Sequence, residues 1–420
     1  MGETIESEDN DGNVVYSVYC PDGKLKETYT SINPSAKITF TYDEQGNRET
    51  ISDPDAGTIT TVYDAFGNLV MQINAKGDTT IFEYDDLNRL TESEDVRGKI
   101  SYEYYSDTTK QSFGKIHTIS NSAQTLTEEF TYDNNTGQLL KFSKEVDSRL
   151  FTFSFLYDWF GRPYSKQYPS GFSIIYGYNN YGDLKSISAN GKQVWSCSSI
   201  NEFGQITAYT QGNYNSQIEY DQFGILEGIS TGNVFDMDYD FDDLGNLSYR
   251  EDNITNQRED FTYDALNRLT DISYELNGVP QTSWEYHIEY SDGGNIISKT
   301  DAAEFIGYGE AANAGPHAVT SMNNITNSWD PVDQSISYNC FNKVDTISQL
   351  DQNNDPIELS FLYGLDNQRI KTVFKRDGNT EKTKYFLGEY EEVTTASGTK
   401  KYHFISGGNG LCGIFNSDVQ

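Results

Sequence analysis

Carboxylates are the most abundant side chains in this sequence that could do chemistry. Asp236, Asp238, Asp240, Asp242 and Asp243 crowd into one short stretch. A glycosidase needs two carboxylates that face each other across a cleft. A spacing of two instead places the first four on one face of an extended strand, which favours a solvated face over a catalytic pair. We therefore assign no catalytic residue and expect that the chain is not an enzyme.

Two Asx-rich runs have oxygen atoms at the spacing that calcium loops use. They are residues 9–13 (Asp-Asn-Asp-Gly-Asn) and residues 351–355 (Asp-Gln-Asn-Asn-Asp). Neither run has the terminal Glu of a complete loop. Runs of Asx and Gly are also ordinary turn sequences. We assign no metal and no cofactor, and calcium remains an alternative.

Nucleophile and zinc patterns are weak. The four histidines are scattered, and none lies near a Ser or Cys in a triad-like context: His117, His287, His317 and His403. The four cysteines are far apart and form no Cys-x-x-Cys pair, so zinc spacing is absent.

Aromatic rings could instead stack on sugars. Trp159, Trp195, Trp284 and Trp329 lie outside the repeat described below, and packing between hairpins is the alternative role for them. Trp159 falls within an expected turn and should be the most exposed. The candidate ligand-facing aromatics are Trp159, Phe66, Phe160 and Phe223.

The elements that would position these groups follow from a short repeated phrase. It reads aromatic, polar, any, bulky apolar, Gly or Asn, polar, aliphatic, as in 63–69 (Tyr-Asp-Ala-Phe-Gly-Asn-Leu) and 84–90 (Tyr-Asp-Asp-Leu-Asn-Arg-Leu). Tyr220, Phe241 and Tyr263 open further copies. A fixed period of this length indicates a repeat architecture, which offers a surface or an enclosure before a catalytic pocket.

The fifth position of the phrase requires a special backbone. Regular copies carry only Gly or Asn there, the two residues that enter the left-handed region most cheaply. This choice predicts a hairpin turn with one residue of positive φ. The preceding Asp should accept backbone N–H groups of the turn. The structural turn residues are Gly46, Gly67, Asn88, Gly161, Gly182, Gly204, Gly224, Gly245 and Asn267.

The flanks of the phrase alternate with a period of two, as in Phe82 and Tyr84, which places both rings on one face of a strand. An aliphatic residue such as Leu90 follows the turn. A lone hairpin is unstable in water. We therefore predict an all-β fold in which stacked antiparallel β-hairpins form one long, twisted, spiralling sheet.

Composition limits the partners. The chain has 420 residues, 64 acidic against 30 basic side chains and a formal charge of −34. Phosphate binding needs a basic surface, so we expect no nucleic-acid partner. The sequence lacks an apolar stretch long enough to span a bilayer, and we expect no membrane insertion and a monomer.

The domain organisation follows the repeats. We expect a leading strand or partial repeat over 1–18, the hairpin array over 19–384 with a degenerate unit near 305–337, and a different β segment from 385 to 420. Both ends look cut from a longer chain, and no signal peptide is present in this stretch.

The recurring Tyr-Asp pair, as at 42–43, 63–64, 84–85 and 263–264, resembles the YD-repeat or Rhs-repeat family. Residues 315–320 (Gly-Pro-His-Ala-Val-Thr) and 366–371 (Asp-Asn-Gln-Arg-Ile-Lys) are similar to segments common late in such arrays, and 385–415 resembles the approach to the family's core. The resemblance covers residues 12–415.

The resemblance implies a β-sheet that spirals into a hollow shell, as in bacterial Rhs and wall-associated proteins, insecticidal toxin complexes and teneurins. In the toxins the shell encloses a C-terminal polymorphic toxin domain, released at a core aspartyl self-cleavage site. No position here matches that motif, because the sequence stops at Gln420 before it. We therefore expect an open, curved sheet with exposed ends.

The function implied is that of a non-catalytic segment of a secreted or cell-surface bacterial protein. Its partner would be its own C-terminal cargo domain. The alternative is an adhesin module that binds a glycan or another cell-surface ligand, which is carbohydrate binding by the turn aromatics.

Overall fold

The computed structural model describes residues 2–9, 12–31, 33–54, 56–291, 293–309, 317–325, 334–351 and 353–419. Within these ranges the chain forms β-strands and turns and contains no helix. The expected all-β hairpin array is confirmed as one continuous sheet of 38 strands.

The first half of the sheet contains β1 (Glu6–Glu8), β2 (Val14–Tyr19), β3 (Leu25–Thr30), β4 (Ile38–Tyr42), β5 (Arg48–Asp53), β6 (Gly57–Tyr63), β7 (Leu69–Ile73), β8 (Thr79–Tyr84), β9 (Leu90–Asp95), β10 (Gly98–Tyr104), β11 (Ile116–Asn121), β12 (Leu126–Tyr132), β13 (Leu139–Val146), β14 (Arg149–Tyr157), β15 (Pro163–Gln167), β16 (Ser173–Tyr178), β17 (Leu184–Ala189), β18 (Lys192–Ile200) and β19 (Ile206–Gln211).

The second half contains β20 (Tyr214–Tyr220), β21 (Leu226–Thr231), β22 (Phe235–Phe241), β23 (Leu247–Asp252), β24 (Gln257–Tyr263), β25 (Leu269–Leu276), β26 (Val279–Pro280), β27 (Tyr286–Tyr290), β28 (Ile296–Lys299), β29 (Ala303–Tyr308), β30 (Val319–Ile325), β31 (Gln334–Tyr338), β32 (Val344–Leu350), β33 (Pro356–Tyr363), β34 (Arg369–Arg376), β35 (Asn379–Phe386), β36 (Tyr390–Thr395), β37 (Gly398–Gly407) and β38 (Gly410–Val419).

The topology is a simple meander. Each strand pairs antiparallel with the next along the chain, as β6 does with β7 and β7 with β8. The short β26 is the exception, because β25 pairs with both β26 and β27. Since neighbouring strands run in opposite directions, every second turn falls on the same edge of the sheet. The Tyr-Asp turns therefore lie along one edge, which we call the turn rim.

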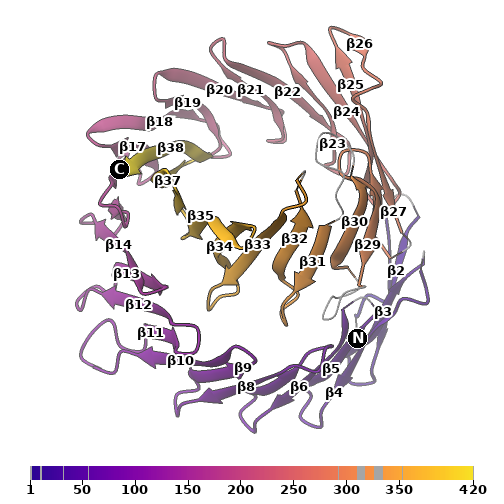
Figure 1. Cartoon of the computed structure of the whole chain (residues 1–420), viewed down its shortest axis with the longest axis vertical. Helices are drawn as coiled ribbons and strands as arrows, with labels where there is room; N and C mark the ends of the chain where they lie inside the picture. Colours follow the sequence, from indigo (N-terminus) through magenta and orange to yellow (C-terminus); the bar gives the residue numbers. More distant parts are fainter. Residues whose placement is uncertain are drawn as a thin grey trace.

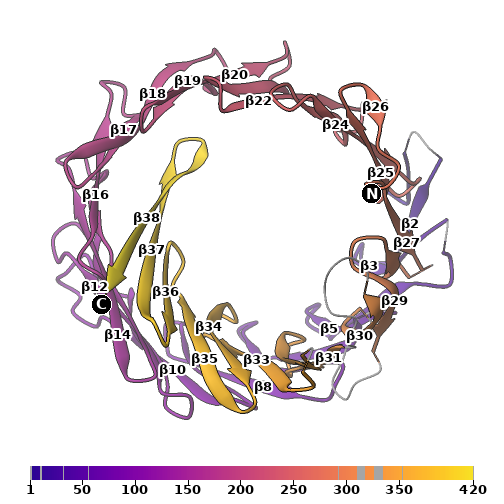
Figure 2. The same cartoon turned by 45° about the horizontal axis from the view of Figure 1, so that its top comes forward.

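The sheet curls into a ring and continues past one full turn, with the late strands inside the outline of the ring (Figures 1 and 2). The overlap begins where the side chain of Asn13 donates to the carbonyl of Ala265 at 2.7 Å. Further on, Lys76 Nζ donates to the carbonyl of Asn339 at 3.0 Å. Accumulated strand twist and coiling supply this curvature.

The sheet is open and curved, as expected, but it also overlaps itself. The pairing remains open, because β1 pairs only with β2 and β38 only with β37 among the described strands. However, the sheet overlaps itself, so its early and late parts form two layers. The ladder runs without a break from β35 to β36, and the boundary at residue 385 stays a prediction.

The main core lies where the two layers meet. Aromatic and aliphatic side chains from β12–β20 face those of β34–β38, and the cluster contains Leu126, Val146, Phe151, Phe153, Tyr168, Phe172, Ile174, Ile187, Ala189, Trp195, Cys197, Tyr209, Ile218, Ile370, Tyr385, Leu387, Tyr390, Ile405 and Cys412. We call this layer contact the seam. Outside the seam many apolar side chains are only half-buried, as the burial of β7 illustrates, and Ile100, Ile288 and Ile336 are buried.

Candidate functional site: the turn rim and the seam

The Asp of each Tyr-Asp turn holds the turn closed. Asp64 Oδ1 accepts the backbone N–H groups of Phe66 at 2.8 Å and Asn68 at 2.9 Å, and its Oδ2 accepts the amide of Asn68 at 2.9 Å. The hydrogen bond from the Asn68 side chain, helped by these backbone donors and opposed by desolvation, lowers the pKa of Asp64. The Asp therefore has the turn role expected of it.

The Gly or Asn of the turn has positive φ at all nine predicted positions, from 57° at Asn88 and Asn267 to 98° at Gly182. Asn replaces Asp in some copies. Asn201 Oδ1, for example, accepts the N–H groups of Phe203 at 3.0 Å and Gln205 at 2.9 Å. An amide oxygen is thus sufficient for the turn, and a negative charge is not required.

The tyrosine hydroxyl joins neighbouring hairpins. The ladder between β7 and β8 ends at Met71 and Ile81, short of the rim. Across the gap that follows, Tyr84 Oη donates to the carbonyl of Leu69 at 2.9 Å. The same link, to the first residue of the strand after the preceding turn, joins Tyr42 to Leu25, Tyr104 to Leu90, Tyr157 to Leu139, Tyr178 to Pro163, Tyr220 to Ile206, Tyr263 to Leu247, Tyr290 to Leu269, Tyr308 to Ile296, Tyr338 to Val319 and Tyr363 to Val344.

Sequence reasoning missed these links. Alternation explains why an aromatic stands before the turn but not why that aromatic is usually Tyr. The preference for Tyr over Phe at one position was the signal that a hydroxyl is used there. Arginines at the end of some turns add a second link. Arg89 ion-pairs with Asp85 of its own turn at 2.5 Å and lies 4.4 Å from the ring centre of Tyr104 in the next hairpin.

The rim exposes a row of apolar side chains. Trp159 is 97% exposed, and Phe66, Phe160 and Phe223 are also exposed. The structure adds residues at the same turn position that the sequence analysis did not select, chiefly Tyr181 and Phe203. Each of these rings stands on a turn closed by an Asp or Asn. All except Trp159 directly precede the turn Gly, so the repeat presents them at equivalent places. Their role in binding remains a prediction.

The other tryptophans differ from Trp159. Trp195 is only 1% exposed, and its Nε1 donates to Asn409 Oδ1 at 2.9 Å within the seam, so it offers no sugar platform. Trp284 is partly exposed and packs edge-on against Tyr274. Trp329 lies outside the described residues.

The acidic candidates serve turns and strand faces. Asp238 and Asp240 are exposed on β22, as a solvated face requires. In the calcium-like runs, Asn10, Asp11 and Gln352 lie outside the described residues. Asp351 accepts the N–H groups of Asn353 and Asp355 and ion-pairs with Arg376. Among described residues no group of three His, Cys, Asp or Glu is placed to hold a metal.

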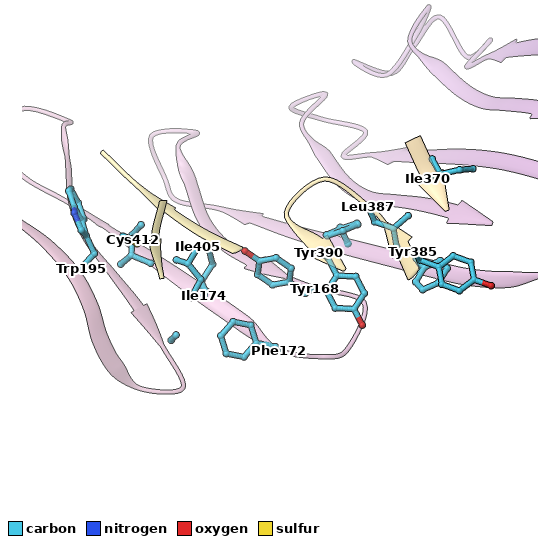
Figure 3. Packing of buried hydrophobic residues seen from close by; sticks show 14 of the residues in the cluster. Tyr168, Phe172, Ile174, Trp195, Ile370, Tyr385, Leu387, Tyr390, Ile405 and Cys412 are labelled. Atoms are coloured by element: carbon cyan, nitrogen blue, oxygen red, sulfur yellow. The ribbon is translucent and has the colours of Figure 1, made fainter. Parts of the chain in front are cut away.

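The seam brings together residues that are far apart in the sequence (Figure 3). Ser170 Oγ and His403 Nε2 are 2.6 Å apart, and Tyr168 Oη donates to the carbonyl of Phe404 at 2.9 Å. Burial lowers the pKa of His403. The sequence analysis found no His near a Ser or Cys in a triad-like context, and folding brings Ser170 and His403 into contact across 233 positions.

Ion pairs also cross the seam. Asp147 accepts both Lys371 Nζ, at 2.5 Å, and Tyr385 Oη, at 2.8 Å. Arg149 pairs with Glu392, which is 4% exposed and also accepts Tyr390 Oη at 2.5 Å. We call the outer layer of the overlap, which contains β12–β20, the wall, and the late strands β34–β38 the inner strands. These ion pairs hold the inner strands against the wall in one register. Of the Ser170–His403 pair, His403 is fully buried in the seam, and Ser170 is half-buried.

A pocket of about 490 Å³ lies at one end of the seam. Its lining joins the turns around Asp183 and Gln205 to Gly408 and Asn409 of the β37–β38 turn. Lys185 is also in the lining, and its ammonium donates to the carbonyl of Cys197 at 2.5 Å. The groups are mixed in charge and specify no reaction.

The geometry defines a class, the spiralling β-hairpin repeat shells. The RHS Repeat model matches residues 63–100. Human Teneurin-4 is 25% identical over 73% of this chain, and mouse Teneurin-4 is 24% identical over the same share. The match spans 12% of the length of each relative. The comparisons therefore support the resemblance to Rhs-repeat or YD-repeat proteins.

Solved structures share the fold. The crystal structure of TcdB2-TccC3 superposes with a TM-score of 0.72 at 14% identity, covering 96% of this chain and 25% of that one. The Photorhabdus luminescens Tc holotoxin pore with a TccC3 D651A mutation gives 0.73 at 14% identity, covering 94% and 23%. Within the described ranges, no helix is long and apolar enough to cross a membrane.

Proposed function

We propose that this chain is a non-catalytic wall segment of a β-shell in a secreted or surface-exposed bacterial protein. The shell would enclose or present a C-terminal cargo, such as a polymorphic toxin domain. The observation that carries the proposal is the overlap of the sheet with itself. The wall curls through more than one turn, and its layers are joined where the overlap begins by Asn13 and Ala265 and within the seam by Trp195 and Asn409.

The direction of the chain supports this role. The strands β37 and β38 lie within the outline of the ring in both views, so the later sequence runs inside the wall (Figures 1 and 2). A further structural relative is TcdB2-TccC3 without its hypervariable C-terminal region, with a TM-score of 0.71. A shell of this kind works by exclusion, which a rigid repeat wall provides without a catalytic group.

Limited proteolysis of the parent protein tests enclosure. We expect the cargo to survive a protease that digests it rapidly when it is expressed alone. A seam variant such as Arg149→Met should shorten that protection. If the cargo is cut equally fast with and without the shell, enclosure is wrong. Sedimentation analysis of the chain tests the expected monomer.

The turn rim favours a second candidate, an adhesin that binds a glycan. Phe160, Tyr181, Phe203 and Phe223 stand on four consecutive rim turns. Neighbouring turns are two strands apart, about 9.6 Å, and ring faces at regular intervals suit the C–H faces of sugars along a chain. A glycan array compares the parent chain with Trp159→Ala and Tyr181→Ala variants. Signal at background level for the parent chain removes this candidate.

A further inference from the structure

His403 joins three segments of the seam. It lies on β37, and its Nδ1 is 2.9 Å from the carbonyl of Phe415 on β38. A carbonyl oxygen only accepts, so Nδ1 carries a proton. Nε2 of the neutral ring is then the acceptor for the hydroxyl of Ser170, 2.6 Å away in the turn between β15 and β16 of the wall. When His403 is neutral, the docked arrangement therefore specifies the tautomer with its proton on Nδ1.

The surroundings of His403 are aromatic. Its side chain is fully buried, and the ring centres of Tyr168, Phe172, Tyr390 and Phe415 lie 5.2, 4.7, 5.1 and 5.5 Å from its own. The wall contributes the first two rings, while β36 and β38 contribute the others. An imidazolium in this box would be a buried charge without a hydrogen-bonded anion, which is costly.

Titratable and charged groups near His403 are already engaged. Tyr168 Oη donates to Phe404, and Tyr390 Oη donates to Glu392. Glu392 of β36 pairs with Arg149 of the wall and lies 4.0 Å from Lys401 on the strand of His403 itself. Lys401 opposes protonation of His403 and Glu392 favours it, but both are weaker influences than burial.

We propose that His403 is an acid-sensitive latch: protonation would place a charge inside the buried aromatic box, and this cost favours the release of β37 and β38 from the wall. The wall hairpins keep their own ladders and stay folded. The latch goes beyond the proposed function, because it concerns how the two layers of the sheet separate. It does not depend on whether a cargo is enclosed.

The direction of the effect follows from the pKa. Burial holds the pKa of docked His403 below its ordinary value of 6.5. A released His403 would recover that value, so the released state binds the proton more tightly. Docking is therefore at full strength above about pH 6.5 and weakens as the pH falls. Each pKa unit between the two states changes the docking equilibrium about tenfold.

Hydrogen exchange of the full chain at pH 7.5 and pH 5.0 tests the latch. After correction for intrinsic rates, we expect protection of β37 and β38 to fall at the lower pH. The hairpin β4–β5 of the wall serves as the internal reference and should stay constant. Carboxylates titrate near pH 4, so a transition between pH 5 and 6.5 reports a histidine. Equal protection of the inner strands at both pH values overturns the proposal.

Two variants identify the titrating group. His403→Gln cannot gain a proton and should abolish the pH dependence. Ser170→Ala should lower protection at both pH values and keep the pH dependence. A pH-dependent loss that persists in His403→Gln overturns the latch. If that variant fails to dock at any pH, Lys401→Met decides, because removing the Lys401 charge raises the pKa of His403 and should shrink the loss; an unchanged loss overturns the latch.

Discussion

The hydroxyl of Tyr84 donates to the carbonyl of Leu69 across the gap between two neighbouring hairpins. The backbone ladder between β7 and β8 ends at Met71 and Ile81, short of the rim, and the Tyr84 hydroxyl supplies a hydrogen bond beyond that point. Because the link recurs along the array, the rim is held repeat by repeat by tyrosines. The repeated Tyr-Asp phrase thus has two structural roles: its Asp closes its own turn, and its Tyr joins the neighbouring hairpin.

Tyr84→Phe tests this link. The variant keeps the ring and removes one hydrogen bond, so we expect a loss of about 1 kcal/mol in the free energy of unfolding. Urea denaturation followed by circular dichroism measures it. Tyr181→Phe is the matched control, since that ring is 92% exposed, and should unfold like the parent. Equal midpoints for all three proteins would contradict the role of the hydroxyl.

Gly67→Ala tests the turn backbone. Gly67 has φ of 84°, and an added Cβ meets nothing within 4 Å, so the cost comes from the backbone conformation alone. We expect about 1–2 kcal/mol of destabilisation by urea titration. Asn88→Gly, at the equivalent position, should change stability by less than about 0.5 kcal/mol. A Gly67→Ala protein as stable as the parent would show that the turn relaxes.

Acid stability should depend on the turn aspartates. Hydrogen bonds from Asn47, Asn68 and Asn246, opposed by desolvation, lower the pKa values of Asp43, Asp64 and Asp242. Because the folded pKa values are depressed, this stabilisation is present above the ordinary value of 3.8 and is lost as the pH falls through the folded values.

The triple variant Asp43→Asn, Asp64→Asn and Asp242→Asn should therefore show a shallower fall in Tm between pH 5 and 2 than the parent. Natural copies such as Asn201 show that an amide closes the turn, so the variant should fold at neutral pH. Calorimetry across this range measures the slope. A variant with the same slope as the parent would exclude these carboxylates as the cause.

Gly407→Ala tests the fit of the seam. A Cβ at Gly407 would lie 2.9 Å from the indole ring of Trp195, which is itself buried. Overpacking of this kind costs about 1–3 kcal/mol, and hydrogen exchange of β37 and β38 should rise accordingly. Gly413→Ala is the control, because its Cβ meets nothing within 4 Å. Identical exchange in both variants would place Gly407 away from the Trp195 ring.

Arg149→Met tests the ion pair across the seam. It leaves Glu392 buried without its main partner, and we expect a loss of about 1–3 kcal/mol. The value lies below that of a fully buried pair because the Arg149 side chain is 43% exposed. Arg258→Met, which removes the partly exposed pair with Asp260, should cost less than about 1 kcal/mol. Hydrogen-exchange protection of β36 measures the effect of Arg149→Met. Equal losses of stability in the two variants would contradict the argument from burial.

Much of the fold could be predicted from the sequence because the same local constraints recur in each repeat. Gly67 and Asn88 stand where positive φ is needed, and no non-local contact is required to make that choice. The alternation of Phe82 and Tyr84 fixes which face is apolar, since side chains on a strand alternate. These features determine strand, turn and antiparallel neighbour, and therefore the array of hairpins.

Tertiary structure alone decided the rest. The contact of Ser170 with His403 and that of Asn13 with Ala265 depend on the summed curvature of many hairpins. A small change of twist in each would accumulate and move the contact to another residue. The sequence by itself therefore determined the repeating unit and its turn. The curvature of the whole sheet decided which residues form the seam, because the rotation summed over many hairpins cannot be derived from the residue spacing within one repeat.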